Sequence, residues 1–143
     1  MRGVFERVAE ESKGCVSEAD FSFASHTTAG IGGAAPLCLY PESVPAAGCA
    51  LRVLKKYGVP YVVLGSGANV LAADRGFDGA VVSTDRMRTI SLDGETVYAE
   101  SGVRAARRLR ALADAGLGGF AFMAGIPASV GGAVYMNAGT ARG

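Results

Sequence analysis

The sequence lacks an excess of charge of one sign and a long apolar run, and each absence argues against one class of protein. Its 14 Lys and Arg residues nearly balance its 13 Asp and Glu residues, which argues against a nucleic-acid-binding protein. No apolar run reaches the roughly 18 residues that a membrane span needs. We therefore expect a small-molecule partner, no nucleic acid and no membrane.

Several sequence motifs are also missing. The three cysteines, Cys15, Cys38 and Cys49, have no Cys-x-x-Cys spacing, so we expect reduced thiols and no metal site. The N-terminus carries Glu6, Glu10 and Glu11 where a signal peptide has a basic start, which predicts a cytoplasmic protein. No G-x-x-x-x-G-K-[ST] motif occurs, which excludes the phosphate loop of nucleoside triphosphatases.

Glycine is abundant, at 21 of 143 residues, and the glycines occur in clusters that indicate tight turns or close ligand approach. Residues 30–35 match the dinucleotide fingerprint G-x-G-x-x-A, and residues 65–70 match its first two glycines. Neither has the strand, turn and helix context that this fingerprint requires. The turn at 65–69 follows an apolar strand and is either an anion-binding nest or a plain β-turn.

Periodicity predicts an α+β fold with two lobes. We expect helices near residues 1–14, 43–58 and 104–115, and strands at 37–40, 60–64, 70–73, 79–83, 89–92 and 96–100. The strand, helix, strand order predicts that 37–40 and 60–64 are parallel neighbours in one sheet. The predicted lobes are residues 1–72, with a small parallel sheet, and 73–143, with short strands and a helix whose Arg107, Arg108 and Arg110 face solvent.

The last segment, residues 116–143, is rich in glycine and has no clear period. Its small residues at 125–133 either pack tightly between the lobes or leave room for a flat cofactor.

Three segments in order, Thr27–Gly33, Leu64–Leu71 with Asp74, and Gly125–Gly139, together resemble the UDP-N-acetylenolpyruvoylglucosamine reductase family, also called UDP-N-acetylmuramate dehydrogenase. The resemblance implies the two-lobed FAD-binding fold of vanillyl-alcohol oxidase-type flavoproteins, with FAD between the lobes. It also implies a C-terminal substrate domain that this chain does not contain.

The resemblance implies specific cofactor contacts. Backbone N–H groups of Gly65, Ser66, Gly67, Ala68 and Asn69 would cradle the FAD pyrophosphate. From the second lobe, Pro127, Ser129, Gly131, Gly132 and Ala133 would line the cofactor, and Asn137 and Gly139 would hold the shape of that loop. The sequence departs from the family at Ser66, Ala68 and Ala128, where relatives usually have Gly, Ser and Gly, so a hydroxyl contact to phosphate is lost or moved.

Family members are about twice as long, and their catalytic arginine, serine and glutamate come after position 143, so no catalytic residue is assigned. In the full enzyme, NADPH would reduce FAD and the hydride would pass to the enolpyruvyl group of a UDP-sugar in peptidoglycan synthesis. We expect this chain alone to be inactive, and the protein to be a monomer or weak oligomer. The alternatives are another FAD oxidoreductase of this fold, in which His26 could carry the flavin covalently, and a flavin-binding or structural domain without activity.

Overall fold

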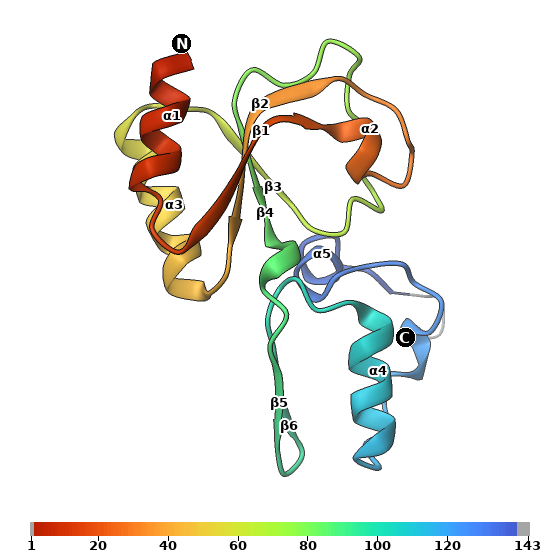
Figure 1. The fold of residues 1–143 in the computed structure, drawn as a ribbon. Helices are drawn as coiled ribbons and strands as arrows, with labels where there is room; N and C mark the ends of the chain where they lie inside the picture. Colours follow the sequence, from red (N-terminus) through yellow and green to blue (C-terminus); the bar gives the residue numbers. More distant parts are fainter. Residues whose placement is uncertain (1, 140–143) are drawn as a thin grey trace.

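The strands form two separate sheets in the computed structural model, which describes residues 2–139 (Figure 1). The larger sheet has the order β1–β2–β4–β3, and the smaller is the hairpin β5–β6. The strands are β1 (Cys15–Ser22), β2 (Ala34–Pro41), β3 (Tyr61–Leu64), β4 (Ala80–Ser83), β5 (Ile90–Asp93) and β6 (Thr96–Ala99). Mixed helices and strands in two parts confirm the predicted α+β class.

The arrangement inside the larger sheet differs from the prediction. β1 is antiparallel to β2, so the sheet is mixed and not purely parallel. β2 and β3 are parallel as expected, but β4 lies between them and pairs with both. A helical crossover between two strands favours a parallel arrangement in one sheet, but it does not determine whether another strand enters between them. Every residue of β4 is buried, as a central strand requires.

The position of β4 also corrects the predicted lobe boundary. A division after residue 72 would place β4 in the second lobe, whereas it pairs within the first sheet. The chain leaves this sheet only at Ser83, through the 3-10 turn η1 (Thr84–Arg86). Residues 70–73, expected to be a strand, form a loop.

Two helices, α1 (Arg2–Glu11) and α3 (Val44–Lys56), lie on the same side of the larger sheet (Figure 1). α3 begins where the Ser43 hydroxyl accepts a hydrogen bond from the Ala46 N–H, the expected capping contact. Val8 and Leu54 from the helices pack with Leu39 and other strand residues into one core cluster. The other face is covered by a second cluster around Phe21, next to the short helix α2 (Phe23–His26).

The remaining elements are α4 (Ala105–Asp114), the 3-10 turn η2 (Ala121–Met123) and α5 (Val130–Tyr135). α4 confirms the predicted helix, and Arg107 and Arg110 are exposed as predicted, whereas Arg108 is half-buried. The Arg107 guanidinium donates to the Arg88 carbonyl at 2.9 Å, and the Arg108 guanidinium lies 4.8 Å from the centre of the Phe120 ring. None of the helices within residues 2–139 is long and apolar enough to span a membrane.

Candidate functional site

A cavity of about 890 Å³ lies beside β3. It extends from the edge strand across the loop 70–77 to the first turn of α5. Its lining is mainly apolar: Phe23, Tyr61, Val62, Val63, Leu64, Val70, Leu71, Ala72, Ala73, Gly76, Phe77, Thr84, Ser101, Gly131, Gly132 and Tyr135. An apolar hollow of this size with few polar groups is typical of a cofactor or small-molecule site.

The loop 65–69 joins Leu64 to Val70, two of the residues that line this cavity. Its shape depends on Gly67, whose φ of +69° is in the left-handed region. A Cβ on Gly67 would lie 2.3 Å from the His26 carbonyl oxygen, and the Thr28 N–H donates to the Gly67 carbonyl at 3.0 Å. The segment 26–28 therefore holds the loop in its turn.

Backbone donors of this loop are available to a ligand. Within residues 2–139, the N–H groups of Ser66, Gly67, Ala68 and Asn69 donate to no protein acceptor. Successive free N–H groups in a turn form a concavity that binds anions such as phosphate. This favours the nest over the plain turn.

The second predicted segment, residues 127–133, is fixed by hydrogen bonds to the start of α4. The Ala105 N–H donates to the Ala128 carbonyl, and the Val130 N–H donates to the Val103 carbonyl, both at 2.8 Å. Ser129 is buried, and its hydroxyl accepts from the Gly132 N–H at 3.3 Å, which caps α5. A Cβ on Gly131 would lie 2.7 Å from Ser101 Cβ, so the small residues here permit close packing as well as room for a ligand.

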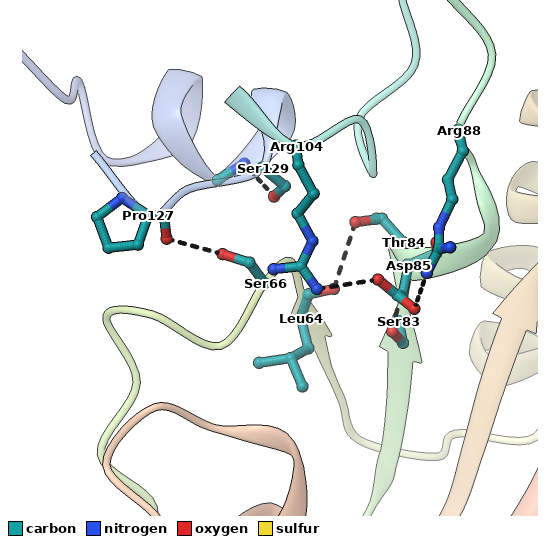
Figure 2. Close-up of polar contacts among 10 residues, drawn as sticks. Leu64, Ser66, Ser83, Thr84, Asp85, Arg88, Arg104, Pro127 and Ser129 are labelled. Atoms are coloured by element: carbon teal, nitrogen blue, oxygen red, sulfur yellow. Dashed lines mark hydrogen bonds and ion pairs between the residues drawn. The ribbon is translucent and has the colours of Figure 1, made fainter. Parts of the chain in front are cut away.

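The two segments meet, as Figure 2 shows. The Ser66 hydroxyl donates to the Pro127 carbonyl oxygen at 3.3 Å. Next to this contact, a Cβ on Gly65 would lie 2.5 Å from Ser129 Oγ. Two segments that are far apart in the sequence thus contact each other beside the cavity.

Gly131 and Gly132 line the cavity, whereas none of the other predicted site residues is among its lining residues. Ala133 is buried at 7% exposure, and Asn137 and Gly139 lie beyond the end of α5. The Asn137 and Ala138 N–H groups donate to the Val134 and Ala133 carbonyls, with Asn137 at a φ of +48°. This is the Schellman arrangement that ends a helix, so Asn137 shapes the segment without lining the cavity.

Sequence reasoning missed the apolar walls of the cavity. Tyr61, Val62 and Val63 of the edge strand are exposed, at 44%, 37% and 59%, and Tyr135 on α5 is 89% exposed. The apolar run at 61–64 gave the strand, but only the sheet order makes it an edge. α5 was missed because its glycines have low helix propensity, although Ser129 was a possible capping signal.

A charged cluster lies where η1 approaches α4. The Asp85 carboxylate accepts from Arg88 at 2.5 Å and from Arg104 at 3.2 Å, and Figure 2 shows it between the two guanidinium groups. All three side chains are at least one-third exposed, so each ion pair contributes at most about 1 kcal/mol to stability. Through Arg104, the cluster joins the start of α4 to η1 at the end of the larger sheet.

The remaining candidate functional groups are the His26 imidazole and the cysteine thiols. His26 Nδ1 is 2.8 Å from the Ser22 carbonyl oxygen, and its ring stacks on Phe21 at 4.3 Å. Burial raises the pKa of the Cys38 thiol to about 12 and that of Cys15 to about 11, which keeps both protonated near neutrality. Within residues 2–139, no cluster of His, Cys, Asp and Glu could hold a metal ion.

Known proteins are similar to this chain in sequence and in fold. The sequence model of the family described as "FAD binding domain" matches residues 35–143. The UDP-N-acetylenolpyruvoylglucosamine reductase of Bacillus subtilis is 41% identical over 140 residues, which are 97% of this chain and 46% of that protein. A crystal structure of UDP-N-acetylenolpyruvylglucosamine reductase from Thermus caldophilus superimposes with a TM-score of 0.69 at 32% identity, over 90% of this chain and 44% of that one.

A likeness of fold alone extends further. The Physcomitrella patens protein BBE-like 1 superimposes with a TM-score of 0.57 at 22% identity, over 78% of this chain and 26% of that one. The chain spans about half the length of the curated reductases that it matches. The resemblance seen in the glycine-rich segments is therefore confirmed over nearly the whole chain, and the protein belongs to the FAD binding domain family.

Proposed function

We propose that this chain is the FAD-binding portion of an NADPH-dependent reductase that converts UDP-N-acetylglucosamine enolpyruvate to UDP-N-acetylmuramate in peptidoglycan synthesis. The observation that carries this proposal is the loop 65–69, whose free N–H groups lie beside an apolar cavity of about 890 Å³. The N–H groups suit a pyrophosphate, and the apolar walls suit a flat ring system. One ligand with both parts is FAD.

The chain's own residues would bind and orient this cofactor. Gly65, Ser66, Gly67, Ala68 and Asn69 would offer backbone donors to the pyrophosphate, because charged acceptors strengthen such hydrogen bonds. Pro127, Ser129, Gly131 and Gly132 would form the opposite edge, while Ala133 would support it from beneath and Asn137 and Gly139 would fix its C-terminal turn. Bound FAD would supply hydride transfer from NADPH to the enolpyruvyl group.

Groups that act on the UDP-sugar belong to the part of the proposed enzyme that this chain does not contain. We assign no catalytic residue among residues 1–143. We also propose that the protein is cytoplasmic, that it acts as a monomer or weak oligomer, and that it has no nucleic-acid or membrane partner.

The test is a titration of the purified protein with FAD, followed by flavin absorbance and by quenching of flavin fluorescence. We expect saturable binding and, in the presence of NADPH and the UDP-sugar enolpyruvate, no NADPH oxidation above that of free flavin. A protein that takes up no FAD contradicts the binding assignment, and turnover by this chain alone contradicts the assignment of catalysis to a missing part. Flavin colour that stays on acid-precipitated protein would instead indicate covalent attachment, with His26 as the candidate.

A further inference from the structure

The Ser66 hydroxyl makes the side-chain hydrogen bond that joins the two halves of the site. It connects residues 61 positions apart in the chain. Among residues 2–139, no other side-chain hydrogen bond links the loop 65–69 to the segment 127–133; Gly65 and Ser129 meet there by packing only. A relative with glycine at position 66 has no hydroxyl to make this contact.

The direction of this hydrogen bond limits what Ser66 can do for a ligand. A serine hydroxyl has one proton to donate, and here the Pro127 carbonyl accepts it. The hydroxyl therefore has no proton left for a phosphate oxygen, whereas the backbone N–H groups of Ser66 to Asn69 have no protein acceptor within residues 2–139. Ser66 can thus offer its backbone N–H to a phosphate while its side chain joins the two segments.

We propose that Ser66 is a positioning residue that holds the loop 65–69 against the segment 127–133, so that a dinucleotide cofactor meets both edges of its site already assembled. The proposal rests on the proposed FAD function. The Ser66–Pro127 contact is open to solvent in the free protein, and a cofactor spanning both segments would cover it and strengthen it. A ligand that touches only the loop gains nothing from the contact.

The test compares FAD, which would span both segments, with ADP, which would contact only the loop. FAD and ADP are titrated separately into the parent protein, Ser66→Ala and Ser66→Thr. We expect Ser66→Ala to bind FAD about three- to tenfold more weakly, the effect of one hydrogen bond, and to bind ADP as the parent does. Ser66→Thr keeps a hydroxyl and should restore FAD binding.

Two results overturn the proposal. Equal weakening of FAD and ADP by Ser66→Ala would make the hydroxyl a phosphate ligand. Unchanged FAD affinity in Ser66→Ala, in a parent that binds FAD, would remove any role for the contact.

A readout without cofactor separates failure of this proposal from failure of the FAD assignment. Ser66→Ala should speed amide hydrogen exchange in residues 128–133 by about twofold or more, because the segment loses one of its restraints, while exchange in α3 stays unchanged. A parent that binds no FAD contradicts the proposed function alone. Exchange that is the same in Ser66→Ala and parent contradicts the positioning role, whether or not FAD binds.

Discussion

The two parts of the molecule differ in how their buried apolar side chains are arranged. Residues 2–83 have continuous apolar clusters on both faces of the larger sheet. Residues 84–139 have isolated buried residues such as Val103, Leu112 and Met123, and they are fixed by close backbone approaches. A Cβ on Gly102, for example, would lie 1.9 Å from the Thr84 carbonyl oxygen. Backbone approaches as close as this also occur in the first part, at Gly33 and Gly76, so the continuous apolar clusters are what distinguish the first part from the second.

The site lies where the first part (residues 2–83) meets the second part (residues 84–139). β3 contributes an apolar wall from the first part, and α5 contributes a glycine-rich turn from the second. Burial of apolar surface gives rigidity without regard to direction, whereas glycine contacts allow a ligand to approach the main chain. A cofactor site built from both has a firm wall and an accessible backbone.

Loss of core volume in the first part should give the largest effect. Leu39 is fully buried in β2, and we expect Leu39→Ala to lower the free energy of unfolding by about 2–5 kcal/mol. Leu92, on β5, is 39% exposed, so Leu92→Ala should change it by about 0.5 kcal/mol. Urea unfolding measures both. Similar losses in the two variants would refute the contrast between the parts.

A smaller effect should come from adding one carbon atom at Gly67. Gly67→Ala places a Cβ 2.3 Å from the His26 carbonyl oxygen at a φ of +69°. The matched control is Gly94→Ala, since Gly94 has a φ of +56° and nothing within 4 Å of its Cβ position. The control should lose about 1 kcal/mol to strain, and Gly67→Ala about 1–3 kcal/mol more because the turn is overpacked.

FAD affinity completes the Gly67 comparison. Gly67→Ala should also weaken FAD, since the turn that presents the N–H groups is displaced, while Gly94→Ala should leave FAD binding unchanged. Equal stability and affinity in the two variants would show that the approach of residues 26–28 does not shape the loop.

The smallest effect should be a loss of stability at pH 8 to 10 that is caused by Cys38. This residue lies in the first part, which contains all three cysteines. Burial raises the pKa of Cys38 from 9.0 to about 12, so the folded protein keeps the proton that the unfolded chain releases. The contribution of Cys38 to stability is therefore full well below pH 9 and falls as the pH rises toward 12, by about 1 kcal/mol between pH 9 and pH 10. Unfolding of Cys38→Ala at pH 8, 9 and 10 should show a shallower decline, and an unchanged slope would contradict this.

Three examples show how much of the structure could be predicted from the sequence. The helix predicted at 43–58 is α3, which begins at the Ser43 cap with Pro45 in its first turn and ends at Lys55 and Lys56. Such capping and charge preferences act within a few residues. β4 was predicted as a strand and placed in the wrong lobe, since sequence separation does not determine which strands pair. The glycines at 65 and 67 predicted a tight turn, but the reason that Gly67 must be glycine is the His26 carbonyl, which is distant in sequence.

The sequence by itself determined most of the strands, the helices α1, α3 and α4, the glycine-rich turns and the family, because these depend on residue types at short spacing. Only the tertiary structure decided that β4 enters the first sheet, that β3 becomes an apolar edge beside a cavity, and that the Ser66 hydroxyl turns to Pro127. The reason is that strand order, exposure and contacts between distant segments result from the packing of the whole chain, in which each element selects its neighbours by burial and by the space that small residues leave.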